Sequence, residues 1–296
     1  MANAKETGLI AKKAEEVKAN TAEVTATTAK AKNLTFSAFV NTPAVQKAIM
    51  NTLQDSARAK TFSSSLISAV TVNPDLRTCD PASVVSAALL GESLGLSPSP
   101  QLGNYYIVPF NAKAKVNNQG EVVAPARRVG TFQIGWKGYY QLAMRCGEYK
   151  KIAAEPVKEG ELISWNPLTE EIVLNPITDP LKRESAKTIG YYAYFELLNG
   201  FRKEMYWSKE KMEQHAMRYS QGYRAKKGYT FWEKDFDGMG IKTMYRQLIS
   251  KYGVMSIEMQ KAFTSDMTAN TSLDGSASAE YVDSDDVFEV EAVEVE

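Results

Sequence analysis

The stretch FQIGWKGYYQLAMRCGEYKKI, residues 132–152, alternates aromatic rings with positive charges. Its rings are Phe132, Trp136, Tyr139, Tyr140 and Tyr149, and its cations are Lys137, Arg145, Lys150 and Lys151. Rings stack on nucleobases and cations neutralise phosphates, so the stretch has both groups that hold a nucleic-acid strand without reading its sequence. An amphipathic helix with a core of rings and solvated cations would show the same pattern. The neighbouring segments decide between these two interpretations.

The segment before it, SPSPQLGNYYIVPF at residues 97–110, predicts the beginning of β structure, because repeated prolines exclude a long helix. Residues 117–120 then supply turn-forming Asn and Gly between two extended arms. The cations on these arms are Lys113, Lys115, Arg127 and Arg128. The pattern predicts a basic β-hairpin that leads into the ring and cation stretch, a path that could follow a phosphate backbone. A merely solvated hairpin is the alternative.

The segment after it predicts further antiparallel β structure. A short β unit is expected at residues 162–174. Residues 189–197 and 201–207 alternate in polarity around Asn199-Gly200, which is the strongest short-range signal for a β-hairpin. Ser208 then caps a predicted helix that carries His215, the single histidine, on its apolar face. We therefore expect His215 to pack in the core rather than to act as a catalyst.

Two further groups of cations follow. Arg224, Lys226 and Lys227 lie in a glycine-containing loop, interleaved with aromatic residues at 223, 229, 231 and 232. The last strong helix has apolar residues at helical spacing from 241 to 252, which leaves Lys242 and Arg246 one turn apart on another face. Such a pair could bind successive phosphates.

The ends of the chain differ from its body. Residues 1–32 contain no aromatic residue and predict a flexible arm or frayed helix. Residues 33–96 predict a helical lobe, in which Asp80 and Pro81 begin a helix and Gly95 follows its end. Residues 266–296 hold ten Asp or Glu and no Lys or Arg, so residues 1–265 carry 35 basic against 25 acidic residues. We expect a disordered acidic tail beside a positive body that binds a polyanion. A tail that only aids solubility is the alternative.

These patterns predict an α+β fold for residues 33–265, with the helical lobe followed by an α+β core at 97–265. No run of about 18 apolar residues could span a bilayer, and the charged N-terminus does not resemble a signal peptide, so we expect a cytoplasmic protein and no membrane partner. Cys79 and Cys146 share no short motif and predict no disulfide, which fits a reducing compartment.

Three blocks in this order, PSPQLGNYYIVPF, FQIGWKGYYQLAMRCGEYKKI and FWEKDFDGMGIKTMYRQLISKYGVMSIEMQKAF, resemble the RecT family of phage and prophage single-strand annealing proteins. The resemblance covers roughly residues 35–263. It implies ATP-independent binding and annealing of single-stranded DNA in recombination and repair, ring-like or helical oligomers, a partner 5′–3′ exonuclease and a fold related to the Red beta and Rad52 annealing proteins. It is also compatible with contact to the host single-strand DNA-binding protein. The arm and the tail lie outside the matching blocks.

From the residue patterns and the resemblance together we expect a DNA-binding surface without a cofactor. Its expected residues are Gln101, Tyr105, Lys113, Lys115, Arg127, Arg128, Lys137, Tyr139, Lys150, Arg224, Lys226, Lys227, Lys242 and Arg246. Asp283, Asp285, Asp286 and Phe288 in the tail resemble the acidic, Phe-containing tips of bacterial single-strand binding proteins. The tail could therefore compete with DNA for this surface.

Enzymatic alternatives fit the sequence less well. Residues 130–135 are followed by Trp136 rather than by the lysine of a phosphate-binding loop, which excludes a nucleotide motor of that type. One His and two distant Cys do not form a typical structural zinc site. Glu148-Tyr149-Lys150 has the spacing of a metal-dependent nuclease, but only Glu92 or Glu121 could replace the upstream Asp. Asp235 and Asp237 could hold a metal, although they fit a helix cap better. A protein that coats DNA without annealing it is the remaining alternative.

Overall fold

A computed structural model describes residues 34–112, 115–116, 122–266, 268–269 and 280–281. The chain divides into two compact units, Met1–Val72 and Asn73–Glu296. Among the described residues, none of the helices is both long and apolar enough to cross a membrane.

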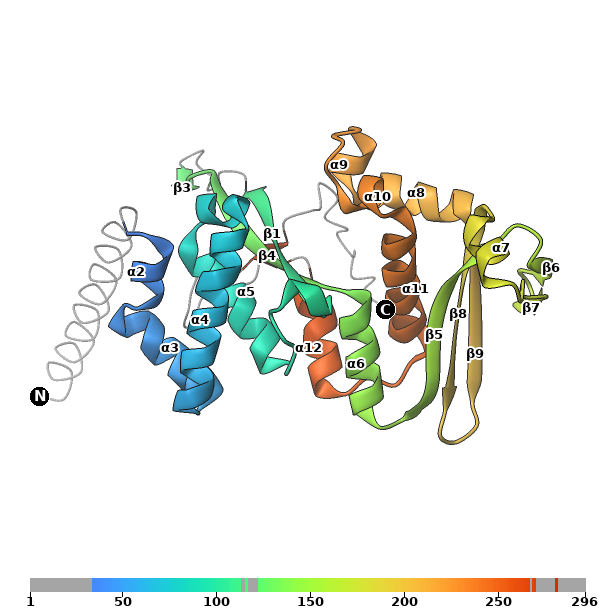
Figure 1. The fold of residues 1–296 in the computed structure, drawn as a ribbon, viewed down its shortest axis with the longest axis horizontal. Helices are drawn as coiled ribbons and strands as arrows, with labels where there is room; N and C mark the ends of the chain where they lie inside the picture. The colour runs from blue at the N-terminus through green and yellow to red at the C-terminus, as the bar shows by residue number, and fades with distance from the viewer. Residues whose placement is uncertain (1–33, 113–114, 117–121, 267, 270–279, 282–296) are drawn as a thin grey trace, which may run out of the picture. The chain divides into compact units, whose positions relative to one another are not determined.

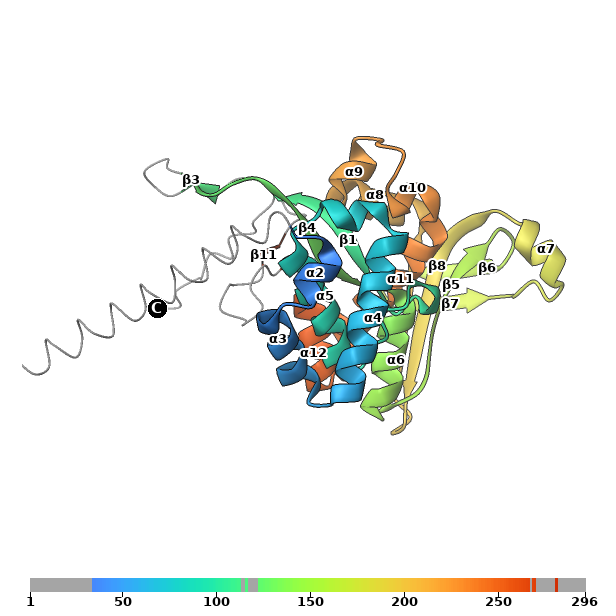
Figure 2. The same cartoon turned by 60° about the vertical axis from the view of Figure 1, so that its left-hand side comes forward.

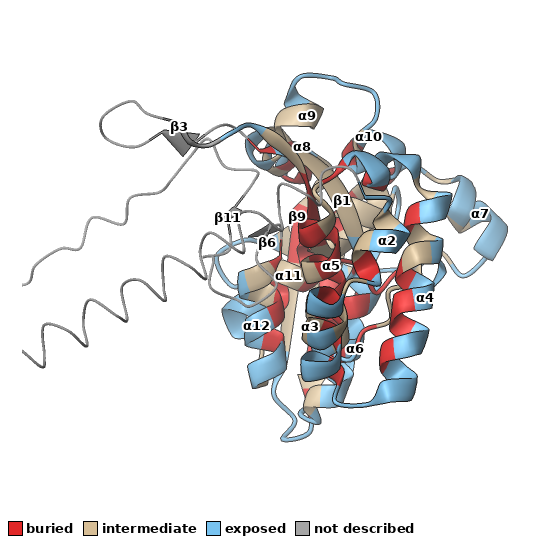
Figure 3. Ribbon diagram, turned by 90° about the vertical axis from the view of Figure 1, so that its left-hand side faces the viewer, coloured by how far each residue is buried: buried red, intermediate tan, exposed pale blue. Residues whose placement is uncertain are grey.

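The first unit is helical in its described part. Its helices are α2 (Phe36–Val40), α3 (Pro43–Leu53) and α4 (Ser56–Val72). Pro43 occupies the first turn of α3, where its missing N–H costs nothing. Helical spacing buries Val45, Ile49 and Leu53 of α3. Buried positions in α4 recur in the same way and alternate with exposed ones along the helix (Figure 3), so the predicted helical periodicity of this part is confirmed.

The second unit begins with a helix packed on a sheet. The 3₁₀ helix η1 (Pro74–Thr78) precedes α5 (Pro81–Ser93), and the side chain of Asp80 caps α5 by accepting from the Ala82 N–H at 3.0 Å, as predicted. Strand β1 (Tyr105–Ala112) pairs antiparallel with β4 (Arg127–Ile134). Helix α5 lies against β4 because Gly130 leaves room: a Cβ there would be 3.0 Å from Val84, and its N–H donates to Ser83 Oγ at 2.8 Å.

Short elements extend this sheet and its hairpin. The 3₁₀ helix η2 (Pro100–Leu102) leads into β1, and β2 (Lys115–Val116) pairs antiparallel with β3 (Val122–Ala124) between β1 and β4. The predicted hairpin is therefore confirmed in its paired backbone. Beyond β4, β10 (Thr268–Ala269) and β11 (Glu280–Tyr281) complete the strand order β1-β4-β10-β11.

A second antiparallel sheet has the strand order β5-β8-β9. Its strands are β5 (Tyr149–Lys158), β8 (Thr188–Leu197) and β9 (Arg202–Ser208). Gly200 turns the chain between β8 and β9 with φ of 87°, which confirms the hairpin predicted from Asn199-Gly200. Helices α6 (Trp136–Cys146) and α11 (Phe236–Tyr252) lie on the same side of this sheet (Figure 1). Gly240 lets α11 approach, since a Cβ there would be 2.6 Å from the ring of Tyr191.

A smaller hairpin of β6 (Leu162–Asn166) and β7 (Glu171–Leu174), followed by α7 (Pro180–Ser185), lies beside the second sheet (Figure 2). The ring of Trp165 meets Tyr206 of β9 edge-on at 5.3 Å. Buried Glu161 accepts from Arg183 Nε at 2.7 Å, which ties the hairpin to α7 and lowers the pKa of Glu161 against the opposing effect of burial.

Four helices complete the second unit. They are α8 (Lys209–Tyr219), α9 (Gln221–Arg224), α10 (Phe231–Lys234) and α12 (Ile257–Ser265). Ser208 caps α8 as predicted, because its side chain accepts from the Lys211 N–H. One apolar core joins both sheets to α5, α6, α8, α11 and α12.

The architecture confirms an α+β fold with antiparallel sheets, and the structure places two parts of the chain in ways that the sequence did not indicate. Helix α5 belongs to the second unit rather than to the helical lobe expected at residues 33–96, because its apolar side meets β1 and β4. Asp266, the first residue of the expected free tail, is buried and is bonded to β4 and α11. The rest of the tail lies outside the described residues, except for the two-residue strands β10 and β11.

Candidate nucleic-acid interface

Four partly exposed aromatic rings gather where β1, α6 and α10 meet. They are Tyr106, Trp136, Tyr140 and Phe231, with exposed fractions of 37%, 37%, 40% and 49%, and we call them the aromatic surface. The rings of Tyr106 and Phe231 lie 6.0 Å apart. The ring of Trp136 stacks on that of Tyr245 of α11, with ring centres 6.2 Å apart and an interplanar angle of 12°. One face of the Trp136 ring is therefore covered by Tyr245. These rings offer faces that side chains of the chain itself do not fully cover.

Local geometry explains why these rings face outward. Strand β1 alternates, so Tyr105 points into the core and Tyr106 points away from it. Helix α6 buries its residues 138, 139, 142 and 143, which leaves Trp136 and Tyr140, one turn apart, on the outer face. Gly138 lets the helix approach the chain at Asn104, because a Cβ there would lie 2.1 Å from the Asn104 carbonyl oxygen.

Lys137 belongs to the same surface, as predicted from the opening stretch. Its Nζ lies 5.6 Å from the centre of the Trp136 ring. Its side chain and the Tyr106 hydroxyl both lie over Gly103, where a Cβ would be 3.4 Å from Lys137 and 3.1 Å from Tyr106. A cation beside two rings can pair with a phosphate while bases stack nearby.

A segment with three cations joins this surface: Arg224 ends α9, and Lys226 and Lys227 lie in the loop that follows it. Arg224, Lys226 and Lys227, which we call the cationic loop, are all exposed and form no ion pair with any residue that the structure describes. Glu233 fixes the end of the loop by accepting from the Gly228 N–H at 2.8 Å and the Thr230 N–H at 3.0 Å. The loop leads directly into Phe231, so this predicted cluster lies next in sequence to a member of the aromatic surface.

The predicted hairpin cations are placed differently. Arg127 lies 3.8 Å from Asp80, and Arg128 lies 3.3 Å from Asp75 and donates to Thr78 Oγ1 at 2.9 Å. Both arginines therefore have acidic partners, Asp80 at the N-cap of α5 and Asp75 in η1, although their side chains stay about one third exposed. Lys113 lies outside the described residues, and only the backbone of Lys115 is described, in β2.

Lys242 and Arg246 lie one helical turn apart on α11, as predicted, but they converge on a carboxylate. Arg246 donates to Asp266 Oδ2 at 2.6 Å, and Lys242 Nζ lies 3.8 Å from Asp266 Oδ1. Tyr139 also donates to Asp266, at 2.9 Å. Burial lowers the pKa of Lys242, and the carboxylate opposes that shift. In this arrangement the pair holds Asp266 rather than an external phosphate.

Two tyrosines that we expected to stack on bases are core residues. Tyr105 lies under Gly91, where a Cβ would be 2.2 Å from its ring, and its hydroxyl donates to the Ala88 carbonyl at 3.3 Å. Tyr139 is fully buried, and burial together with Asp266 raises its pKa well above the ordinary value. Neither ring face is accessible in this structure, so both expectations are corrected: the alternating neighbour Tyr106 and the outward α6 residues occupy the surface instead.

The remaining expected residues lie apart from one another. Gln101 is exposed in η2, two residues before Gly103 and thus close in sequence to the aromatic surface. Lys150 lies on β5 and pairs with Glu196 of β8 at 2.5 Å. That pair also lowers the pKa of Glu196. Lys150 is therefore paired with an acidic residue of the second sheet.

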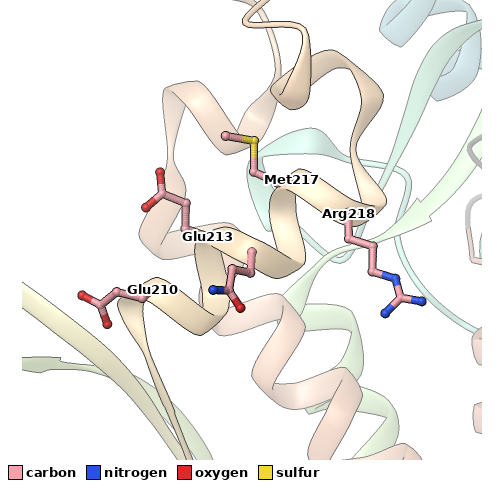
Figure 4. Close-up of a pocket in the computed structure, with 5 residues that line it drawn as sticks. Glu210, Glu213, Met217 and Arg218 are labelled. Carbon is pink, nitrogen blue, oxygen red and sulfur yellow. The ribbon is translucent and has the colours of Figure 1, made fainter.

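One hollow on α8 does not add a nucleic-acid site. It has a volume of about 530 Å³ and is lined by Glu210, Glu213, Gln214, Met217 and Arg218. Figure 4 shows Glu210 and Glu213 toward the beginning of the helix and Arg218 toward its end. Carboxylates repel phosphates, so this side of α8 does not suit a DNA backbone. His215 packs on the inner side of α8, with its ring centre 5.5 Å from that of Trp207 and 4.5 Å from that of Tyr219. Burial lowers the pKa of His215 to about 4.

The residues of the nuclease alternative do not assemble. Lys150 is paired with Glu196, and no group of three His, Cys, Asp or Glu that could hold a metal occurs within the described ranges. Asp235 caps α11 by accepting from the Gly238 N–H at 2.9 Å, and Asp237 accepts from the Tyr191 hydroxyl at 2.6 Å. These two carboxylates therefore have structural partners, and Glu121 lies outside the described residues.

Comparison with known proteins gives a consistent answer. The family model described as "RecT family" matches residues 60–281. The Bacillus subtilis (strain 168) protein described as "Uncharacterized protein YqaK" is 41% identical over 228 residues, which is 77% of this chain and 70% of that protein. "Protein RecT" of Escherichia coli (strain K12) is 26% identical over 235 residues, which is 79% of this chain and 81% of that protein. The matched region of the family model includes the aromatic surface and the cationic loop.

Proposed function

Because the chain belongs to the RecT family, we propose that it binds single-stranded DNA and anneals complementary strands without ATP, in phage-type homologous recombination. Membership of this family supports a role in recombination or strand annealing, which is not a catalytic activity. The observation that carries the more specific proposal is the aromatic surface, with Lys137 within it and the cationic loop beside it.

The arrangement supports binding by stacking and charge. Tyr106 and Phe231 come from distant parts of the chain, and their rings lie 6.0 Å apart, so bases of one strand could stack on them in succession. Lys137 and the cationic loop would neutralise phosphates of the same strand. Because stacking and phosphate contacts do not depend on the base, such binding would tolerate any sequence.

Annealing follows from binding that leaves base edges free. A strand held by its phosphates and ring faces keeps its Watson–Crick edges available to a complementary strand. Neutralised phosphates also reduce the repulsion between the two polyanions. Pairing then supplies both the free energy and the sequence test, so no nucleotide hydrolysis is required.

Several further elements of the proposal come from the family rather than from the site. We propose that protomers assemble into rings or helical filaments along the strand, since linked binding sites raise the overall affinity. A 5′–3′ exonuclease would supply the single strands, and the host single-strand DNA-binding protein is a further candidate partner. The proposed place of action is the cytoplasm of a bacterial host cell that carries a prophage.

The decisive experiment uses two complementary, fluorescently labelled oligonucleotides mixed with the protein in EDTA and without ATP. Rapid pairing of intact strands is the expected result. Strands that are bound but not paired faster than without protein would instead favour a passive coating protein. Strands that become shorter only after Mg²⁺ is added would favour a nuclease.

A further inference from the structure

One buried carboxylate collects donors from three elements of the second unit. Asp266 Oδ1 accepts from the Ile134 N–H at the end of β4 at 3.0 Å. Asp266 Oδ2 accepts from the Tyr139 hydroxyl at 2.9 Å and from Arg246 at 2.6 Å, and Lys242 lies 3.8 Å from Oδ1. We call these four donors the anion cradle. Asp266 itself is 1% exposed.

The cradle has the composition of a phosphate site. It combines a guanidinium, an ammonium group, a hydroxyl and a backbone N–H, which are the donors that bind phosphate oxygens in proteins. A phosphodiester resembles a carboxylate, because each presents two equivalent anionic oxygens and a single negative charge. Replacing the Asp266 carboxylate by a phosphodiester would therefore leave the net charge of the site unchanged.

The carboxylate of Asp266 is held by two cations, Arg246 and Lys242, and by two neutral donors. Among the described residues, none after Phe263 belongs to the apolar core. Strand β10, which follows Asp266, pairs with β4 only through Thr268 and Phe132. The Asp266 carboxylate therefore links the end of α12, which Met259 and Ala262 anchor in the core, to β4, α6 and α11. The charged part of this link weakens when another anion competes.

We propose that the anion cradle is a binding site for a backbone phosphate of single-stranded DNA, which Asp266 fills when DNA is absent. This inference rests on the proposed function and adds a regulatory step to it. A strand that enters the cradle displaces Asp266 together with β10. Displacement also takes the negative charge of Asp266 away from the bound phosphate, which removes its repulsion of DNA.

Asp266→Asn tests the proposal, because the amide keeps the size of the side chain and removes its charge. Binding to a labelled oligothymidylate is measured by fluorescence anisotropy at several salt concentrations. We expect about three- to tenfold tighter binding at low salt. The log–log salt dependence should steepen by about 0.7 for each additional phosphate that the variant neutralises. Restoring the wild-type affinity by adding Arg246→Ala to the variant would assign the tighter binding to the cradle.

The matched control is Glu161→Gln, which neutralises another buried carboxylate that accepts from an arginine, in the β6–β7 region. It should leave DNA affinity unchanged. Wild-type affinity in Asp266→Asn would overturn the inference and leave the proposed function intact. Absence of DNA binding by the wild-type protein would overturn both. Stabilisation of Asp266→Asn, but not of wild type, by inorganic phosphate over chloride at equal ionic strength would show that the cradle binds free phosphate as well.

A second measurement needs no variant and so stays informative if Asp266→Asn does not fold. Hydrogen exchange of residues 268–269 in β10 is followed in the wild-type protein with and without the oligothymidylate. We expect faster exchange with DNA, because β10 leaves its pairing with β4 when Asp266 is displaced. Unchanged or slower exchange in a protein that binds the oligonucleotide would overturn the displacement of Asp266.

Discussion

The ring of Phe231 at the start of α10 lies 6.0 Å from the ring of Tyr106 in β1, at an interplanar angle of 36°. Both side chains remain substantially exposed. Their contact brings the end of the cationic loop next to the strand that leads from the proline-rich segment. The ring and cation segments around Tyr106 and around Phe231 therefore contribute to one surface. Single substitutions can test the role of each residue in it.

Phe231→Ala should weaken binding of single-stranded DNA about tenfold, since removing a ring that stacks on a base typically costs about 1–3 kcal/mol. The rate of annealing at limiting protein should fall in parallel. Anisotropy titrations with an oligothymidylate give the affinity. Phe201→Ala is the matched control, because Phe201 is 48% exposed, almost the same as Phe231, but lies at the β8–β9 turn. Equal effects of both substitutions would argue against the aromatic surface.

Lys227→Ala should reduce the salt dependence of DNA binding, because each phosphate contact to a single strand contributes about 0.7 to the log–log slope. Lys227 has no ion pair with a described residue, so its removal exposes no buried charge. The slope is obtained from affinities measured across a range of NaCl concentrations. Lys182→Ala, an exposed lysine in α7, should leave the slope unchanged. An unaltered slope in Lys227→Ala would remove this residue from the interface.

Local patterns were sufficient to predict most of the elements. Period-two alternation and Asn199-Gly200 indicated the β8–β9 hairpin, and Asp80 with Pro81 indicated the start of α5. These signals act between neighbouring residues, so they do not depend on the rest of the fold. The periodicity did not indicate that α5 lies in the second unit, because it shows that a helix has an apolar side but not which element covers that side.

The site was predicted less completely, for two physical reasons. In β1 two adjacent tyrosines compete for the inward position, and the close approach of Gly91 to Tyr105, which decides it, is a tertiary contact. The helical spacing correctly indicated that Lys242 and Arg246 lie one turn apart. It did not indicate their partner Asp266, because the sequence analysis described residues 266–296 only by their net charge. The local signal for Tyr106 was the period-two alternation of a strand, which makes one of two adjacent tyrosines face outward but does not say which one.

Gly240→Ala should destabilise the protein by about 1–2 kcal/mol. A Cβ would lie 2.6 Å from the ring of buried Tyr191, whose hydroxyl donates to Asp237, so the ring has little freedom to move. Overpacking typically costs about 1–3 kcal/mol, and the higher helix propensity of Ala offsets up to about 1 kcal/mol. Urea unfolding measures the difference. Ser250→Ala, at an exposed position of the same helix, should change the stability by less than about 0.5 kcal/mol. Equal stability of Gly240→Ala and wild type would show that α11 can shift away from the sheet.

His215→Phe should make stability less dependent on pH between 7 and 5. Burial, followed by the nearby Arg246 and Arg218, lowers the pKa of His215 from 6.5 to about 4 in the folded protein. The unfolded chain therefore binds a proton in this range while the folded protein does not, so stability is present above pH 6.5 and is lost as the pH falls towards 4. The loss between pH 7 and 5 should be about 2 kcal/mol for wild type.

The measurement is urea unfolding of both proteins at pH 7 and pH 5. Phe keeps a ring against Trp207 and Tyr219 but has no group that titrates, so the variant should lose about 2 kcal/mol less than wild type over this interval. Carboxylates with lowered pKa values, such as Glu161, lose their contribution only as the pH falls below about 4.5, so they affect this interval little. The same loss of stability in both proteins would place the titrating group elsewhere and would show that His215 accepts a proton readily in the folded state.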